Sequence, residues 1–118
     1  MRSSRGEIRI YEILTRNEIN FIEEYEFKDL SSPNGKPLRF DFAVLDDDGN
    51  LDFLIEYQGK QHYQAVGKFG GSRGFYQQQF NDNLKRRYCR EKGITLIEVP
   101  YTEEHLVTYD YLMKKAGY

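Results

Sequence analysis

Residues 38–57 read LRFDFAVLDDDGNLDFLIEY, and this stretch decides the fold. Two runs rich in aromatic and branched side chains, 38–45 and 51–57, flank the polar segment Asp46-Asp47-Asp48-Gly49-Asn50. Such runs are typical of β-strands. Because Asp-Gly between two strand-like runs is a strong hairpin signal, we expect the two runs to pair as antiparallel strands.

Upstream of the hairpin, the chain predicts one helix and one strand. The helix covers 4–17, where Ser4 and Glu7 have the spacing of a capping box. The strand covers 21–27. One face of that strand carries Phe21, Glu23, Tyr25 and Phe27.

Downstream, a glycine-rich connection over 59–74 leads to a predicted helix over 75–92, which Gly93 closes. A short buried strand follows over 94–99, and a last helix starts at Thr102. The apolar stripe of the long helix consists of Phe80, Leu84 and Tyr88.

The predicted order is therefore α-β-β-β-α-β-α. A helix joins strand 51–57 to strand 94–99, and such a crossover makes the two strands parallel. We expect an α/β fold with a mixed sheet of about four strands flanked by helices, as a single domain over 1–118.

Composition limits the possible functions. No apolar run approaches the roughly 18 residues of a membrane span, and the N-terminus lacks a signal-peptide apolar stretch, so we expect a cytoplasmic protein. The single Cys89 excludes an internal disulfide and a multi-cysteine zinc site. The net charge of −2 is unusual for a DNA-binding protein, although basic residues crowd 85–92 and could form a local basic face or simply a solvated helix face.

Two carboxylates carry the candidate chemistry. If Asp48 and Gly49 form a two-residue turn, Asp41 lies directly opposite Glu56 on one sheet face. Carboxylates that close repel each other unless a cation lies between them, and Mg²⁺ prefers such oxygen ligands. A three-residue turn over 47–49 would instead put Asp41 opposite Ile55.

Further polar residues surround this pair. Gln58 shares the face of Glu56, and His62 follows just after the strand, where it could orient or deprotonate water. Glu7 fits a capping role and an inward-facing role equally well. Asp82 and Lys85 form a surface ion pair in the plainest interpretation; in the functional one, Asp82 joins the metal site and Lys85 meets a phosphate.

With Asp41 and Glu56-x-Gln58 on successive strands, the chain resembles the PD-(D/E)XK nuclease superfamily. It is most similar to the phage and bacterial domains related to very-short-patch-repair endonucleases, including the EDxHD homing endonucleases. The segments that carry this resemblance are LRFDF (38–42), IEYQGKQHY (55–63), FGG (69–71), DNLKRRYC (82–89) and IEVPY (97–101).

The resemblance implies a restriction-endonuclease-like core and Mg²⁺-dependent DNA cleavage, with Mn²⁺ as a substitute. By position it makes Glu7, Asp41, Glu56, His62 and Asp82 catalytic, with Asp41 and Glu56 as metal ligands. Gln58 departs from the superfamily, which usually has lysine there, so His62 or Lys85 would supply the missing function. We expect substrate contacts from Gln58, Lys60, Arg73, Lys85 and Arg86.

Other functions stay open at this point. The chain could be a catalytically inactive nucleic-acid-binding module on the same fold, a nuclease for RNA or branched DNA, or a small protein-interaction domain. Target specificity would come from the loop over 69–74, from a homodimer or from a partner protein. A single centre nicks one strand, so double-strand breaks would need a dimer or two successive nicks.

Overall fold

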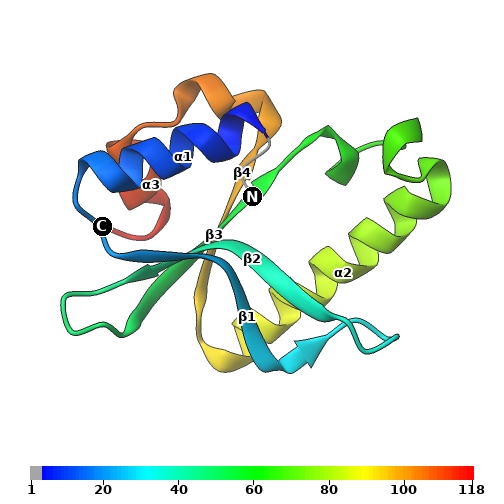
Figure 1. Ribbon diagram of the computed structural model, residues 1–118, viewed down its shortest axis with the longest axis horizontal. Coiled ribbons are helices and arrows are strands. Elements are labelled where there is room, and N and C mark those ends of the chain that lie inside the picture. Colours follow the sequence, from blue (N-terminus) through cyan, green and yellow to red (C-terminus); the bar gives the residue numbers. More distant parts are fainter. Residues whose placement is uncertain (1–3) are drawn as a thin grey trace.

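The computed structural model describes residues 4–118 and shows an α/β fold in the predicted order (Figure 1). The helices are α1 (Arg5–Arg16), α2 (Gly71–Lys92) and α3 (Tyr109–Lys115). The strands are β1 (Phe21–Ser31), β2 (Pro37–Leu45), β3 (Leu51–Gln58) and β4 (Thr95–Pro100). Short 3₁₀ turns are η1 (Lys60–His62), η2 (Gly67–Phe69) and η3 (Tyr101–Leu106).

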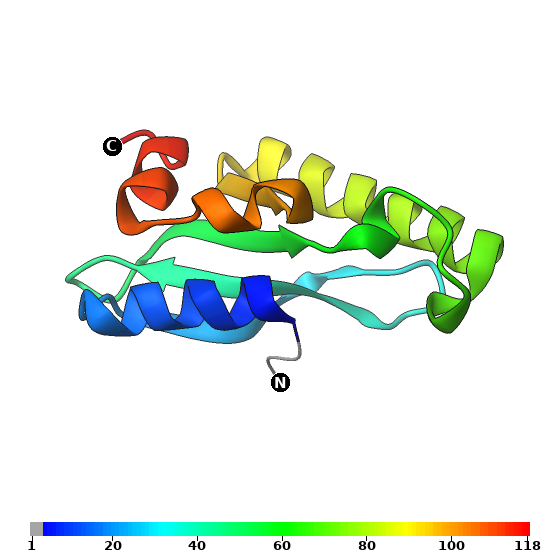
Figure 2. The same cartoon turned by 90° about the horizontal axis from the view of Figure 1, so that it is seen from above.

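The four strands form one mixed sheet in the order β1-β2-β3-β4. The first three are antiparallel, and β3 and β4 are parallel, as the α2 crossover predicts. Helices α1 and α3 cover one side of the sheet and α2 covers the other (Figures 1 and 2). Among residues 4–118, no helix combines the length and the apolar character that crossing a bilayer requires.

Helix α1 starts as its sequence predicts. Ser4 is the N-cap, and its Oγ accepts a hydrogen bond from the Glu7 N–H at 3.2 Å. Ile10 and Leu14, four residues apart, are fully buried against the sheet. Gly6 faces the ring of Tyr57 so closely that a Cβ there would come within 2.0 Å of it. The absence of a side chain at Gly6 therefore lets the first turn of α1 lie directly on β3.

The β2–β3 hairpin has a longer turn than the two-residue form. The Asp46 N–H donates to the Asn50 carbonyl at 2.8 Å, and the Asp46 carbonyl accepts from the Gly49 N–H at 3.0 Å. The turn therefore spans 47–49. Gly49 has a φ of 83°, which glycine adopts without steric cost.

The strand register nevertheless agrees with the first expectation. The pairing shifts between Val44 and Leu45, and this bulge offsets the extra turn residue. Phe42 consequently pairs with Ile55, which puts Asp41 opposite Glu56.

The expectation that Phe21, Glu23, Tyr25 and Phe27 share one face of β1 needs correction, because Phe21 and Phe27 pack against different helices. Phe21 contacts Tyr11 of α1, whereas Phe27 contacts Tyr88 of α2. Between them, Glu24 has a φ of 51°, which interrupts the regular alternation.

Three helical expectations also need correction. Helix α2 begins at Gly71, four residues before Phe75, because the glycine-rich segment continues into the helix. Phe80 is 51% exposed and is not part of the buried stripe, whereas Cys89 is almost fully buried. The segment from Thr102 is not one helix, because Thr108 is extended and caps α3 separately through the Tyr111 N–H.

Candidate active site

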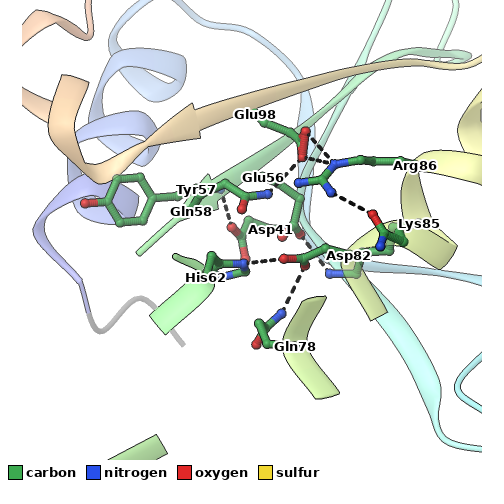
Figure 3. A network of polar contacts seen from close by, with 11 residues as sticks. Asp41, Glu56, Tyr57, Gln58, His62, Gln78, Asp82, Lys85, Arg86 and Glu98 are labelled. Carbon is green, nitrogen blue, oxygen red and sulfur yellow. Dashed lines mark hydrogen bonds and ion pairs between the residues drawn. The ribbon is translucent and has the colours of Figure 1, made fainter. Parts of the chain in front are cut away.

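The side chains of Asp41 on β2 and Glu56 on β3 each accept a hydrogen bond from the backbone of the other strand (Figure 3). The Asp41 N–H donates to Oε1 of Glu56 at 3.0 Å, and the Tyr57 N–H donates to Oδ2 of Asp41 at 2.7 Å. Each carboxylate thus takes a backbone donor that a regular ladder would give to a carbonyl. Within residues 4–118, the second oxygen of each carboxylate accepts no hydrogen bond.

Burial makes both acids weaker than usual. Desolvation raises the pKa of Asp41 to about 6, repulsion from Glu7 adds to the increase, and the Tyr57 N–H opposes it. Desolvation also raises the pKa of Glu56 to about 8, with repulsion from Asp41 as the second cause. The site therefore favours protons or an added cation near these two groups.

Lys85 of α2 supplies one cation. Its Nζ lies 3.2 Å from Oε1 of Glu56, and it also lies over the Phe40 ring at 5.4 Å from the centroid. Both Lys85 and Glu56 are buried, with 8% and 4% exposure. A lysine from α2 thus reaches the acidic pair.

His62 and Asp82 form a second pair. Nδ1 of His62 lies 2.8 Å from Oδ2 of Asp82, and the Gln78 amide donates to Oδ1 of Asp82 at 3.0 Å. Both members of the pair are buried. The expected Asp82–Lys85 ion pair is wrong, because the two side chains bind different partners; Asp82 holds His62 and does not join the two strand carboxylates.

Gln58 is buried beside a third group, which β4 contributes. Its amide donates to Oε1 of Glu98 at 3.0 Å, and Nε of Arg86 contacts the same carboxylate at 2.7 and 2.9 Å. Arg86, which the sequence assigns to substrate contact, is therefore already engaged by Glu98 and Asn83.

Glu7 takes the capping role that its spacing from Ser4 predicts. Its carboxylate accepts a hydrogen bond from the Ser4 hydroxyl at 2.8 Å. Its repulsion also contributes to the raised pKa of Asp41, so the charge of Glu7 acts on the site even though it makes no direct hydrogen bond there among the described residues.

The basic cluster over 85–92 is largely neutralised by acids. Lys85 and Arg86 contact Glu56 and Glu98, and two further cations form the pairs Arg87–Glu91 and Lys92–Asp29. In contrast, Lys60 and Arg73 are exposed and form no ion pair with the described residues. They are the expected phosphate-contacting residues that keep a free charge.

Asp41 and Glu56 are the residues that could hold a metal ion. No group of three or more His, Cys, Asp and Glu side chains in residues 4–118 is arranged to do so. Mg²⁺, however, keeps several waters and substrate oxygens and commonly takes only one or two protein carboxylates. Two carboxylates that repel each other, each with an unused oxygen, fit that requirement.

The site does not coincide with the cavity near the β2–β3 hairpin. That cavity has a volume of about 840 Å³ and lies at the other end of the sheet, between Asn17, Asp46 and Tyr118. Its lining includes the acids Glu18, Asp46, Asp47, Asp52 and Asp110. So many carboxylates would repel a polyanion.

Sequence reasoning missed Gln78 and Glu98. Gln78 stands four residues before Asp82, so the two side chains share a helix face. Glu98 is an acid in a strand otherwise rich in apolar residues, and it pairs in register with Glu56. The four-residue spacing of Gln78 and Asp82, and the acidic residue within an apolar strand, could have identified both residues from the sequence.

Comparison with known proteins gives relatives among viruses. No family model matches the chain, and no solved structure gives a significant match. The chain is 39% identical over 87 residues to "Uncharacterized protein 307L" of Invertebrate iridescent virus 6, covering 72% of the chain but 44% of that protein. It is 51% identical over 49 residues to "Uncharacterized protein 033L" of Invertebrate iridescent virus 3 and spans 25% of that protein's length.

A third relative matches over most of both chains. "Uncharacterized protein 094L" of Frog virus 3 (isolate Goorha) is 35% identical over 109 residues, which cover 90% of this chain and 68% of that protein. The chain therefore belongs to the same protein family as protein 094L of Frog virus 3.

Proposed function

We propose that this chain is a metal-dependent DNA endonuclease of the PD-(D/E)XK type that hydrolyses phosphodiester bonds. The observation that carries the proposal is the opposed pair Asp41 and Glu56, with Lys85 on one carboxylate and the His62–Asp82 pair beside it. A simple structural role does not account for two desolvated, mutually repelling acids in one sheet.

Asp41 and Glu56 would hold Mg²⁺ or Mn²⁺ through their unused oxygens. Bound there, such an ion supplies Lewis acidity to a phosphate oxygen and lowers the pKa of a water molecule. Lys85 offsets part of the negative charge of Glu56 and replaces the cation that Gln58 lacks.

His62 is the candidate general base. An ionised carboxylate only accepts hydrogen bonds, so Nδ1 carries the proton that faces Asp82, and Nε2 is left as the basic nitrogen. Nε2 takes a proton from the attacking water while the water oxygen bonds to phosphorus. The bond from phosphorus to the leaving sugar oxygen breaks, and that oxygen takes a proton from solvent.

The viral relatives support a virus-infected host cell as the setting, and we propose that DNA in its cytoplasm is the substrate. A homodimer, or a partner protein that supplies specificity, belongs to the same proposal. Since a single centre cuts one strand, a monomer should nick DNA before it linearises it.

The test is cleavage of supercoiled plasmid with Mg²⁺, with Mn²⁺ and with EDTA. Wild type should produce nicked DNA only with metal, and both Asp41→Asn and His62→Gln should lose the activity. Asp47→Asn, an exposed acid in the hairpin turn, is the matched control and should cleave normally. No cleavage of plasmid, RNA or branched DNA under any metal would overturn the proposal, and retained DNA binding would then favour a binding module.

A further inference from the structure

A small cavity is lined in part by neighbours of the His62–Asp82 pair. Its volume is about 260 Å³. The residues that line it and matter here are Gln61, Gln64, Gly71, Gly74, Phe75 and Gln78. Gln61 is the neighbour of His62 in the chain, and Gln78 donates to Asp82 at 3.0 Å. Gln61 and Gln78 therefore connect the lining of the cavity to the His62–Asp82 pair.

The glutamine amides in the lining of the cavity keep hydrogen-bonding groups available. Among the described residues, the side chains of Gln61 and Gln64 make no hydrogen bond, and Gln78 uses only its Nε2. Gly59 contributes to this arrangement, because a Cβ at Gly59 would come within 2.6 Å of Oε1 of Gln61. Each amide thus offers both a donor and an acceptor to a group that enters the cavity.

The size and chemistry of the cavity fit one nucleobase. Pockets for drug-sized ligands measure roughly 300–1,000 Å³, so this cavity suits a smaller group. A base edge presents donors and acceptors side by side, which a glutamine amide can match. Phe75 and the two glycines provide an apolar wall and room for a flat ring.

Two exposed basic residues, Lys60 and Arg73, are neighbours in the chain of residues that line the cavity. Lys60 precedes Gln61 in η1, and Arg73 lies between Gly71 and Gly74 at the start of α2. Both side chains are exposed. A DNA strand that places one base in the cavity would bring the phosphates on either side of that base toward Lys60 and Arg73.

We propose that this cavity receives a single unpaired nucleobase of the DNA strand that is cleaved. The inference rests on the proposed nuclease function and adds its substrate class, namely DNA with an extruded or unpaired nucleotide next to the scissile phosphate. Enzymes that accept such bases spend less energy when the nucleotide is already unpaired. Gln78 then links an occupied cavity to the position of Asp82 and His62.

The experiment compares three end-labelled duplexes of one sequence with Mg²⁺. One is fully paired, one carries an extra unpaired nucleotide, and one carries an abasic sugar at that extra position. Wild type should cut the unpaired-nucleotide duplex about tenfold faster than the abasic duplex, as expected for one or two base-edge hydrogen bonds. Gln61→Leu and Gln64→Leu should bring this ratio close to one, whereas Gln79→Leu should keep it, because Gln79 is an exposed glutamine of α2 outside the cavity lining.

Binding separates failure of this inference from failure of the nuclease proposal. Fluorescence anisotropy with the Asp41→Asn variant should show the same preference, about tenfold, for the unpaired over the abasic duplex. Cleavage of both duplexes at equal rates, with equal binding, would overturn the base cavity and leave the nuclease standing. A binding preference without cleavage of any DNA would retain the cavity and overturn the nuclease, and neither cleavage nor preference would overturn both.

Discussion

Asp41 and Glu56 occupy positions that ordinary folding energetics disfavours. Each carboxylate is desolvated in the sheet. The charge of Asp41 raises the pKa of Glu56, and the charge of Glu7 raises the pKa of Asp41. Their hydrogen bonds to the N–H groups of Tyr57 and Asp41 stabilise the charged forms only in part. Strained electrostatics of this kind is common at sites kept for function.

Replacing Asp41 with Asn should therefore stabilise the metal-free protein at pH 8 by about 1 kcal/mol, since one pKa unit corresponds to about 1.4 kcal/mol. The Asn Oδ1 can still accept the Tyr57 N–H, while the repulsion on Glu56 disappears. Thermal unfolding in EDTA measures the change, with Asp47→Asn as the exposed control. An unchanged or lower Tm for Asp41→Asn would show that the charge of Asp41 carries no cost.

Lys85 stabilises the charged form of Glu56, whereas the charge of Asp41 destabilises it. The change Lys85→Met keeps the apolar contact with Phe40 but leaves Glu56 buried without its cation. Loss of one partner of a buried ion pair costs about 3–5 kcal/mol, so we expect a loss near the lower limit at pH 8. At pH 5 the loss should be smaller, because Glu56, with its raised pKa, is then protonated. Urea unfolding at both pH values measures this.

The variant Lys85→Met also has a rescue test. Adding Glu56→Gln removes the unpaired charge and keeps an acceptor for the Asp41 N–H, so the double variant should recover most of the lost stability. Lys92→Met, which removes an exposed cation paired with Asp29, should change stability by less than about 1 kcal/mol. A double variant no more stable than Lys85→Met alone would contradict the pairing with Glu56.

At the level of elements, α1 approaches β3 most tightly at Gly6 among the glycine positions of the described residues. Gly6, which precedes Glu7 in the chain, lies against the ring of Tyr57, which follows Glu56. This contact therefore helps to fix the position of Glu7, whose charge raises the pKa of Asp41.

The variant Gly6→Ala should force α1 away from β3. The added Cβ would lie 2.0 to 2.6 Å from three ring atoms of Tyr57, and overpacking of this kind costs about 1–3 kcal/mol. The control is Gly67→Ala, where a Cβ meets nothing within 4 Å, and its effect should be small. Chemical unfolding of both variants provides the measurement. Equal stability of the two would mean that α1 does not rest on Gly6.

The sequence predicted the elements where the signal was local. Ser4 and Glu7 gave the start of α1, and Gly93 gave the end of α2. The hairpin shows the limit of such signals. The predicted two-residue turn was wrong, whereas the predicted pairing of Asp41 with Glu56 was right. A bulge at Val44 and Leu45 depends on pairing across the sheet, and Asp48-Gly49 alone does not encode it.

At the level of the whole molecule, the pairings of the site depend on how α2 packs on the sheet. Asp41 opposite Glu56 agrees with the sequence-based expectation, although that expectation assumed a two-residue turn and the bulge at Val44 and Leu45 restores the register. Lys85 on Glu56 and Asp82 on His62 join α2 to β3 and η1, across 29 and 20 residues of sequence. The spacing of Asp82 and Lys85 suggested that they contact each other, and only the tertiary arrangement separates them.

The stability of the metal-free protein should fall between pH 5 and pH 8. Asp41 and Glu56 have folded pKa values near 6 and 8, above their ordinary values, so the folded state binds more protons than the unfolded state in this range. Stability then falls as pH rises. We expect the Tm in EDTA to be lower at pH 8 than at pH 5 by at least about 5 °C, since even about 1 kcal/mol has that effect in a small domain. A Tm that is constant or rises would contradict the raised pKa values.

A divalent ion should reverse this trend only where the two carboxylates are ionised. A metal that binds the folded state stabilises it according to its concentration relative to Kd, and it competes with protons for the same oxygens. Mg²⁺ or Mn²⁺ should therefore raise the Tm at pH 8 and have little effect at pH 5. Asp41→Asn lacks one of the two ligands and should show almost no metal effect at either pH, whereas Asp47→Asn should respond like wild type. If metal raised the Tm equally at both pH values, or equally in Asp41→Asn, the ion would be binding elsewhere on this acidic chain, and the pair at the centre of the sheet would need another explanation.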